Sequence, residues 1–548
     1  MPDKRLITGI LILFVINLLQ AFFTPISEDE AYYWLWSQQL DWGYFDHPPM
    51  VAWWISIGYE FFQNELGVRM LTVFFNSFSV YFLWKILHPI TQNQIKLFFG
   101  IIGSLLVFQV FGFLTTPDAP LLFFTIFYLF SLKKFLEDNS NKASLLLAIS
   151  LAGLMYSKYH GILLILFSLL PIFKIWWRNP KFYLVVLGSL ILYLPHFIWL
   201  FQNDFIPVRY HFLERSADEH FEFRKLFNYL GIYFLGAAPF LSYFIWKSIV
   251  ELKSKNPFEK SIFWLCILPG IFFFFSIFKD NVQPQWLLIS FIPTGLMIYF
   301  RYRNQENLKW IWNLSWIGIF VVLVLRILLV LPGISPFEKN QNFAESVENF
   351  TPERAVFEKY QEASVYKFYN PERTVAVHRT LGNRKSQFTL WNVEEALFGK
   401  EVTYISPWVK SEDSFVGFKN RDYFLKKIPD YQPFDGMEIQ TVEVLNTQKG
   451  EEINLEIEII NHQNHAVSMG GNSDFQLNIN YYKDLQYEIE YKVQIPLDEL
   501  KLDAGASKKL KIRFKNIDQT GEFKACLGLN YRPIGTSYLS KPIRVWVE

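Results

Sequence analysis

The segment between residues 26 and 66 holds the side chains best suited to chemistry. It contains seven acidic residues and no Lys or Arg, the acids being Glu28, Asp29, Glu30, Asp41, Asp46, Glu60 and Glu65. Three adjacent carboxylates at positions 28–30 repel one another, so a metal ion, a basic partner or protonation must compensate them. Carboxylates held in such an environment serve as general bases, which makes Asp29 and Glu30 candidate catalytic residues.

The same segment is rich in aromatic residues, namely Tyr32, Tyr33, Trp34, Trp36, Trp42, Tyr44, Trp53 and Trp54. Aromatic rings beside carboxylates suit a carbohydrate, whose C–H faces stack on rings while its hydroxyls bond to acids. The alternative interpretation is an aromatic belt at a membrane interface with solvated carboxylates around it.

Two further motifs contain Pro beside an acid. In Asp46-His47-Pro48-Pro49 the prolines fix the backbone, and His47 is a candidate for binding a phosphate together with Asp46; a simple Asp46–His47 pair is the alternative. Asp118, in Thr-Thr-Pro-Asp-Ala-Pro, is either a helix N-cap or a second catalytic acid near Asp29. Glu28, Asp29 and Asp118 would suit a divalent metal ion, although no ligand spacing demands one.

Candidate substrate-binding residues are scattered between apolar stretches. Ionisable residues beside membrane spans usually face a cavity, so Lys158, Tyr159, Arg209 and Arg215 are predicted to bind the substrate, with pairing to lipid headgroups as the alternative for the arginines. Another polar and aromatic patch contains Gln283 and Trp286. Arg326, inside the last apolar run, is interpreted as a structural residue that extends toward the interface.

Apolar runs of membrane length crowd the first 331 residues of the 548-residue chain. We expect about eleven spans, near 6–25, 68–88, 97–114, 119–136, 142–157, 160–176, 181–201, 227–247, 261–278, 285–300 and 310–331. The first run lacks a cleavage site and is interpreted as a retained span. The predicted inner segments carry 17 Lys and Arg residues against seven outside, which predicts a cytoplasmic N-terminus and a non-cytoplasmic C-terminus.

Three domains are predicted: a membrane domain over 1–332, a mixed α/β domain over 333–436 and a β-sandwich over 437–548. The last assignment follows from strict polar–apolar alternation, as in residues 452–460 and 509–514, with turn residues between the runs. Two cysteines, one inside an apolar run, predict no internal disulfide. A net charge of +1 gives no case for nucleic-acid binding, and no nucleotide-binding or metalloprotease motif is present.

Several of these motifs resemble those of a known family. Ser27-Glu-Asp-Glu-Ala-Tyr-Tyr-Trp-Leu-Trp-Ser37 and Gly43-Tyr-Phe-Asp-His-Pro-Pro-Met-Val51 look like the first outer loop of PMT-type GT-C glycosyltransferases, in the bacterial branch of the lipid A aminoarabinose transferase and related mannosyl- and galacturonosyltransferases. Thr116–Leu121, Gly153–Tyr159, Gln283–Trp286, Glu362–Tyr366 and Ser386–Trp391 are similar to later parts of that group.

The resemblance covers about residues 1–410 and implies a GT-C fold in a bacterial inner membrane, with the C-terminal domain in the periplasm. It implies inverting transfer from a polyprenyl-phosphate-linked sugar to lipid A, another glycolipid, a glycan or a protein. Asp29 matches the family's first-loop acid and Asp118 the second. His47 stands where the aminoarabinose branch has a Lys, so phosphate binding shifts toward Lys158 or Arg209.

Two other classes of protein remain as alternatives. A transporter or flippase of lipid-linked sugars would need ionisable residues near mid-membrane, broken helices and internal repeats. An envelope assembly protein would act through its β-domain and would tolerate mutation of the acidic loop.

Overall fold

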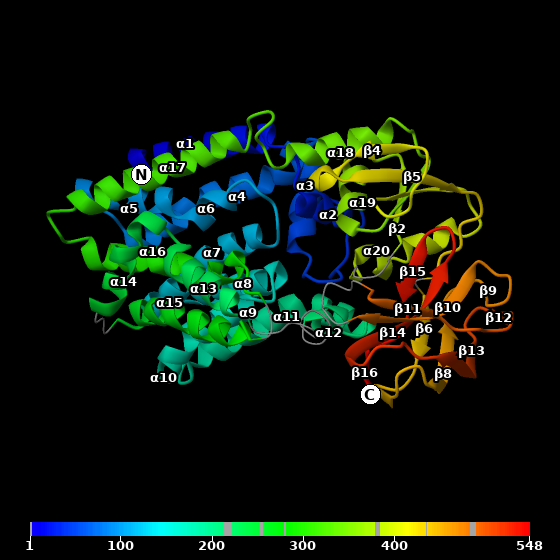
Figure 1. Ribbon diagram of the computed structural model, residues 1–548. Coiled ribbons are helices and arrows are strands. Elements are labelled where there is room, and N and C mark those ends of the chain that lie inside the picture. Colours follow the sequence, from blue (N-terminus) through cyan, green and yellow to red (C-terminus); the bar gives the residue numbers. More distant parts are fainter. Residues whose placement is uncertain are drawn as a thin grey trace. The chain divides into compact units, whose positions relative to one another are not determined.

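The computed structural model describes residues 3–211, 222–251, 256–278, 281–378, 384–434, 436–482 and 489–548. The chain divides into two compact units, Met1–Glu338 and Lys339–Glu548 (Figure 1). The first unit is helical and the second is rich in strands.

Helices α1 to α17 form the first unit. Their bounds are α1 Lys4–Phe23, α2 Glu28–Ser37, α3 Met50–Tyr59, α4 Glu65–Leu87, α5 Gln92–Ser104, α6 Leu106–Val110, α7 Asp118–Asp138, α8 Asn141–Ser157, α9 Gly161–Leu169, α10 Phe173–Trp176, α11 Pro180–Gln202, α12 Ile206–Arg209, α13 Phe223–Leu235, α14 Ser242–Glu251, α15 Pro257–Ser276, α16 Leu288–Tyr302 and α17 Lys309–Leu328. Short 3₁₀ turns are η1 Leu170–Ile172, η3 Pro239–Leu241 and η4 Pro284–Leu287.

The predicted count of about eleven spans is not confirmed. Among the described residues, six helices are long and apolar enough to cross a membrane, namely α1, α4, α7, α11, α15 and α17. A seventh span results if α13 and the segment 239–251 are counted together, although these two are bent by 76°. The chain is therefore a polytopic helical membrane protein with fewer unbroken spans than its apolar runs indicate.

The remaining apolar runs are short or interrupted for identifiable reasons. The run near 97–114 breaks at Leu105, where the backbone N–H of Leu106 donates to the carbonyl of Ala237 at 2.9 Å and so joins the bent pair. Pro171 lies in the 3₁₀ turn between α9 and α10. Helices α8 and α16 have 17 and 15 residues, below the roughly 20 of an average span.

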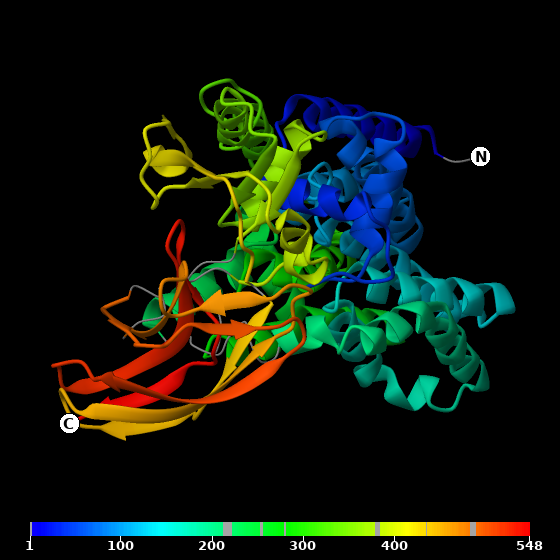
Figure 2. The same cartoon turned by 90° about the vertical axis from the view of Figure 1, so that its right-hand side faces the viewer.

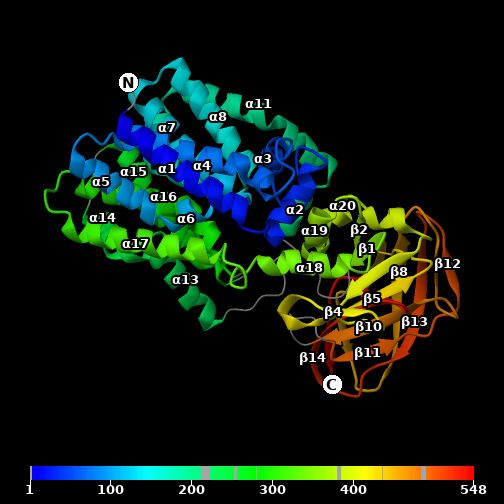
Figure 3. The same ribbon diagram turned by 90° about the horizontal axis from the view of Figure 1, so that it is seen from above.

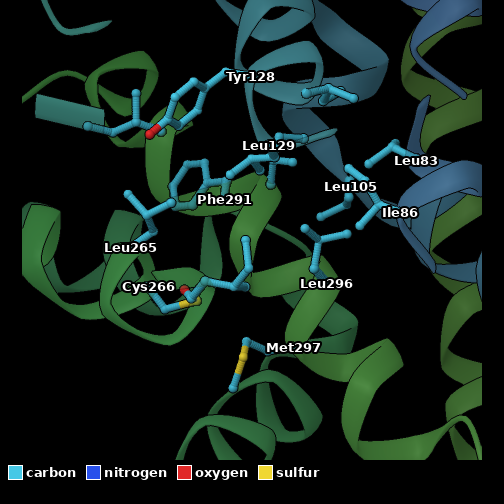
Figure 4. Packing of buried hydrophobic residues seen from close by; sticks show 14 of the residues in the cluster. Leu83, Ile86, Leu105, Tyr128, Leu129, Leu265, Cys266, Phe291, Leu296 and Met297 are labelled. Carbon is cyan, nitrogen blue, oxygen red and sulfur yellow. The ribbon is translucent and has the colours of Figure 1, made fainter. Parts of the chain in front are cut away.

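The core of the first unit lies between the long helices, which run side by side in Figure 3. Leu83, Leu105, Leu129, Phe291 and Leu296 are all buried there, and Figure 4 shows them close together; they come from α4, α7, α16 and the break between α5 and α6. Polar contacts also join helices: Asn17 of α1 donates to Asn76 of α4 at 3.1 Å. Hydrogen bonds between helices are a usual means of association where lipid surrounds the bundle.

The second unit begins with helix α18 (Glu338–Glu348, across the boundary) and a five-stranded sheet in the order β2-β1-β3-β5-β4. Strands β1 (Arg354–Phe357), β2 (Thr374–Val377) and β3 (Val402–Ser406) are parallel, and β5 (Asp422–Ile428) and β4 (Ser414–Val416) are antiparallel additions. Helix α19 (Tyr360–Tyr369) connects β1 to β2, and α20 (Gln387–Leu390) and η5 (Val393–Leu397) precede β3.

The rest of the second unit consists of strands, drawn from yellow to red in Figure 2. One sheet has the order β11-β10-β14-β16-β7 with β15 beside β14, another β13-β8-β6, and β12 pairs with β9. Their bounds are β6 Met437–Gln440, β7 Val444–Thr447, β8 Glu452–Asn461, β9 Val467–Met469, β10 Phe475–Tyr482, β11 Tyr491–Gln494, β12 Leu500–Leu502, β13 Ser507–Lys515, β14 Gly521–Tyr531, β15 Gly535–Tyr538 and β16 Ile543–Val547.

The predicted fold class, a helical membrane protein with a β-rich C-terminal part, is confirmed. Burial alternates residue by residue along most of β8, as the sequence pattern requires of a strand with one buried face. One buried cluster includes Val356 and Tyr404 of the first sheet together with Ile459 and Leu477 of the later ones. The two predicted domains over 333–436 and 437–548 therefore share a hydrophobic core, and their separation stays a prediction.

Candidate active site

The acidic triplet lies in the first turn of α2, which begins with a capping box. Ser27 is the N-cap, its hydroxyl accepts the backbone N–H of Glu30 at 3.2 Å, and the Glu30 carboxylate accepts the N–H of Ser27 at 3.1 Å. Acids in the first turn also interact favourably with the helix dipole. Local sequence therefore fixes where α2 starts, and Asp29 lies exposed in its first turn.

Glu30 is fully buried and forms an ion pair with Arg69 of α4, which is also fully buried. Arg69 Nε donates to Glu30 Oε1 at 2.7 Å, and Nη2 donates to Oε2 at 2.6 Å. The guanidinium also donates to the backbone carbonyls of Ala21, Thr24 and Pro25. Arg69 therefore holds the end of α1 and the start of α2 in one arrangement.

The predicted catalytic role of Glu30 does not fit this geometry. Besides Arg69, its carboxylate accepts the Ser27 hydroxyl at 2.9 Å and the backbone N–H of Thr115 at 2.9 Å. Both carboxylate oxygens already accept hydrogen bonds and are shielded from solvent, so Glu30 is not placed to accept a proton from a substrate. Asp29, one residue earlier and exposed, remains as the candidate base.

The Thr115 contact also brings Asp118 to this end of the helical unit. Asp118 begins α7 but makes no cap; instead, Lys158 Nζ donates to both of its carboxylate oxygens at 2.9 Å. Both side chains are buried. Lys158 is thus paired with an acid, and Asp118 carries a compensated charge, so neither group is an independent site for a phosphate or a proton.

A cluster of His and Tyr side chains connects the Asp46-His47 motif with other segments. The His47 ring lies 6.1 Å from Tyr33 and 5.9 Å from His211, and His211 Nε2 lies 2.8 Å from the Asp46 carbonyl. Tyr33 is four residues after Asp29 on α2, so the two share a helix face. Asp29 and His47 are therefore positioned around the same end of α2.

Tyr159 continues this cluster toward α11. Its ring lies 6.1 Å from His211, and its hydroxyl lies 3.2 Å from Nε2 of the buried His196, whose Nδ1 lies 2.6 Å from the Trp42 carbonyl. Burial and, to a smaller extent, the Asp46 carboxylate raise the pKa of Tyr159. The phenol therefore stays protonated and acts as a hydrogen-bonding group between the loop and α11.

The other predicted binding residues lie in different environments. Arg209 is exposed at the end of α12, two residues before His211. The buried Trp286 ring lies 5.7 Å from the ring of His160, the residue that follows Tyr159, as measured between ring centroids. Gln283 is exposed, and its side-chain oxygen accepts a hydrogen bond from Gln285 at 2.8 Å. Arg215 lies outside the described residues. The cluster thus contains Tyr159, with Arg209 close to His211 in the chain, while the ring of Trp286 contacts His160.

Within the described part of the chain, no group of three or more His, Cys, Asp or Glu side chains is arranged to hold a metal ion. Asp118, one of the three predicted ligands, is engaged by Lys158. The metal site at Glu28, Asp29 and Asp118 therefore stays a prediction without geometric support.

Sequence reasoning missed two residues of this site. Arg69 was counted only as a cation of an outer segment, although a single Arg directly after an acidic loop is the natural partner of one of its acids. His196 lies inside an apolar run, where an ionisable residue usually has a specific partner. Buried Arg326 is the structural residue that was predicted: it donates to Asn17 Oδ1 at 2.7 Å and to the Gln109 carbonyl at 2.6 Å.

Comparisons with known proteins bear on this site. A family profile described as dolichyl-phosphate-mannose-protein mannosyltransferase (PMT_2) matches residues 46–199, a range that includes Asp46, Asp118 and Lys158. An uncharacterised protein of Aquifex aeolicus is 28% identical over 301 residues, 51% of this chain and 58% of that protein. The lipid A galacturonosyltransferase RgtD of Rhizobium johnstonii is 23% identical over 302 residues, 52% of this chain and 62% of that protein. The chain thus spans less than two thirds of either curated relative.

Solved structures show the same fold. The crystal structure of ArnT from Cupriavidus metallidurans in the apo state aligns with a TM-score of 0.56 at 13% identity, over 76% of this chain and 98% of that chain. The structure of the same protein bound to undecaprenyl phosphate aligns with a TM-score of 0.55 at 12% identity, over 78% and 98%. The family prediction made from the first-loop motifs is supported by the profile match over residues 46–199, and the chain shares the fold of the ArnT structures.

Proposed function

We propose that this protein transfers a sugar from a polyprenyl-phosphate-linked donor to an acceptor hydroxyl at the non-cytoplasmic membrane face. The observation that carries the proposal is the pair of adjacent acids on α2: Glu30 is bound to Arg69, and this ion pair fixes the helical turn that presents the exposed Asp29 near the His47 cluster. A fixed carboxylate beside aromatic rings is what a glycosyl acceptor requires.

In the proposed reaction the acceptor oxygen attacks the anomeric carbon on the face opposite the phosphate. The new glycosidic C–O bond forms while the bond between the anomeric carbon and the phosphate oxygen breaks. Asp29 takes the proton of the acceptor hydroxyl, and polyprenyl phosphate leaves with the bonding electron pair. The configuration inverts, and no general acid is required because the phosphate is a good leaving group.

Exposed Arg209 and half-buried His47 are the proposed contacts of the donor phosphate. The Lys158–Asp118 ion pair supports this assignment, since the third predicted cation is already bound to an acid. The proposed role of the Asp118–Lys158 pair is to hold the start of α7 against the end of α8. ArnT binds undecaprenyl phosphate in its crystal structure, and RgtD is described as acting on lipid A, which supports a lipid-linked donor and a lipid acceptor here.

The proposed orientation places the N-terminus in the cytoplasm and the second unit in the periplasm of a bacterial inner membrane. It rests on the distribution of Lys and Arg in the sequence. The proposed task of the second unit, which has no assigned role in the reaction itself, is to position the acceptor.

The test uses the purified full chain in detergent with a panel of polyprenyl-phosphate sugars and a cell-envelope lipid extract. Release of free polyprenyl phosphate is measured for the native chain and for Asp29→Asn. We expect release that needs both the extract and Asp29. Release that Asp29→Asn leaves unchanged would refute the assignment of the base, and no release from any donor by folded protein would favour a transporter, for which the 76° bend before α14 would be the relevant feature.

A further inference from the structure

A cavity lies at the end of the helical unit opposite the acidic loop. It has a volume of about 200 Å³ and lies between the last turns of α7, the segment 169–176 and the first turn of α11. Helix α7 begins at Asp118, beside Lys158, and its 21 residues rise roughly 30 Å before the cavity is reached. In Figure 1, α10 accordingly lies at the lower left of the helical unit and α2 at its right.

The interior of this cavity is apolar. Its wall includes Phe135 and Leu136 of α7, Ile172 and Trp176 of the broken segment, and Phe182 of α11. The volume is below the roughly 300–1,000 Å³ of sites that enclose a whole small-molecule ligand. A segment of hydrocarbon chain fits such a space, whereas a bulky polar ligand does not.

One edge of the cavity is polar and cationic. Asn139 and Asn179 both line it, and Asn179 Nδ2 donates to Asn139 Oδ1 at 2.9 Å. Lys181 Nζ donates to the Asn139 carbonyl at 2.8 Å, which places an ammonium group at this edge. The cavity is therefore amphipathic, with a hydrocarbon interior and a charged rim.

Cations outnumber acids in the segments around the rim. Residues 139–203 contain no Asp or Glu, while Lys174, Arg178 and Lys181 fall within eight residues of one another. The preceding acids are already engaged, since Glu137 lies 3.7 Å from Lys133 and Asp138 accepts the Ser140 hydroxyl at 2.8 Å. An anion at this rim would thus meet an excess of cations.

The short helix α10 presents large apolar side chains on its outside. Phe173 and Ile175 are each 43% exposed, and the following Trp177 is 54% exposed, although all three lie next to charged residues. Exposed aromatic residues that alternate with Lys and Arg are typical of a segment at the membrane–water interface. The rim is thus placed at the depth of lipid headgroups.

We propose that this cavity binds an anionic phospholipid, with one acyl chain in the apolar interior and the phosphate against Lys174, Arg178 and Lys181. Basic pockets between membrane helices are known to take acidic lipid headgroups. A polyprenyl phosphate would present the same anion, but its sugar would then lie roughly a whole helix length from Asp29. The proposal does not depend on the proposed enzymatic activity.

The test measures lipid binding to the full chain in detergent by native mass spectrometry, with phosphatidylglycerol and phosphatidylcholine of identical chains as probes. The charge variant is Lys174→Gln/Arg178→Gln/Lys181→Gln. Its matched control, Lys4→Gln/Lys96→Gln/Lys309→Gln, removes three exposed cations from the first turns of α1, α5 and α17. Leu136→Phe fills the cavity and leaves every charge in place.

We expect phosphatidylglycerol to bind at one saturable site and phosphatidylcholine to bind far more weakly. The charge variant should weaken binding roughly fivefold for each cation removed, while the control should match the native chain. Leu136→Phe should also weaken binding. Equal loss in the charge variant and the control, equal binding of the two lipids, or full binding to Leu136→Phe would each overturn the proposal. Displacement of phosphatidylglycerol by undecaprenyl phosphate at equal concentration would assign the cavity to an isoprenoid instead.

Discussion

Adjacent acids on α2 should respond in opposite ways to the loss of one charge. Glu30→Gln and Asp29→Asn each remove one negative charge and change no side-chain volume appreciably. In the structure Glu30 forms the buried ion pair with Arg69, whereas Asp29 is exposed. We therefore expect Glu30→Gln to cost stability and Asp29→Asn to cost activity.

The magnitude follows from the contacts of Glu30. Its carboxylate accepts hydrogen bonds from Arg69 Nε and Nη2, the Thr115 N–H, and the N–H and hydroxyl of Ser27. A Gln side chain at position 30 has one oxygen that can accept these hydrogen bonds, because its other terminal atom is an NH2 group. The buried guanidinium also loses its counter-charge. Breaking one side of such a pair costs about 3–5 kcal/mol. Asp29→Asn loses an interaction with the helix dipole, worth about 0.3–1 kcal/mol.

The assay combines two readouts on the same preparations. Heated samples in detergent are passed over a size-exclusion column to obtain an apparent melting temperature, and donor turnover is followed by release of polyprenyl phosphate. Glu30→Gln should lower the melting temperature by on the order of 5 °C or more, and Asp29→Asn by much less. At a temperature where both remain folded, Asp29→Asn should abolish release and Glu30→Gln should retain part of it.

A double variant tests the physical reasoning directly. Glu30→Leu/Arg69→Met removes both buried charges, so part of the lost stability should return. Full recovery is not expected, because the carbonyls of Ala21, Thr24 and Pro25 and the N–H groups of Ser27 and Thr115 lose their partners. If Glu30→Gln melts like the native chain and yet has no activity, Glu30 acts in the chemistry and the structural assignment is wrong. If Asp29→Asn is as unstable as Glu30→Gln, the two acids share one structural role.

The other predictions concern the remaining buried polar groups. Asp118→Asn should destabilise the helical unit by about 3–5 kcal/mol because it leaves Lys158 buried without its counter-charge, and Asp118→Leu/Lys158→Met should recover the melting temperature; no difference between the single and double variants would contradict this. Tyr159→Phe removes the hydroxyl next to His196 Nε2 and should cost about 1–3 kcal/mol, measured as a lower melting temperature, while an unchanged value would show that this contact is dispensable. In the second unit, burial raises the pKa of Glu358, so its contribution to stability is present at low pH and is lost as the pH rises through its folded-state value. Glu358→Gln should flatten that slope by at most about 1.4 kcal/mol per pH unit in unfolding measured from about pH 5 to pH 8, and an unchanged slope would contradict it.

Local patterns in the sequence were sufficient to predict much of this architecture. The start of α2 follows from Ser27 and Glu30 at capping-box spacing, and β8 follows from alternation over residues 452–460. Both depend on contacts between residues close in the chain. The proline and aromatic pattern of the first loop was also specific enough to identify the family, because the loop is long and its residue types are unusual together.

Features that depend on distant contacts could not be predicted in this way. The break at Leu105 is stabilised by a hydrogen bond from Leu106 to Ala237, more than a hundred residues away in the chain. The hydropathy of the sequence does not indicate this contact. The partners of Arg69 and Lys158 are likewise 39 and 40 residues distant. Pattern analysis therefore identified which groups carry charge but not which charges neutralise each other, and that pairing separates a structural acid from a candidate catalytic one.

If Asp29 is the proposed base, the ion pair of the neighbouring Glu30 would hold it in position without occupying its own carboxylate. A base that must take a proton needs an accessible lone pair, yet it also needs a fixed position. A single acid bound directly by an arginine would be held in a fixed position, but its carboxylate oxygens would no longer be accessible to the acceptor hydroxyl. Here the arginine binds the next residue in the same helical turn, so the rigidity of Glu30 passes through the backbone of α2 to Asp29 while the Asp29 side chain stays exposed. On this reasoning Arg69 is a positioning residue, and Arg69→Met should lower kcat more than it raises KM.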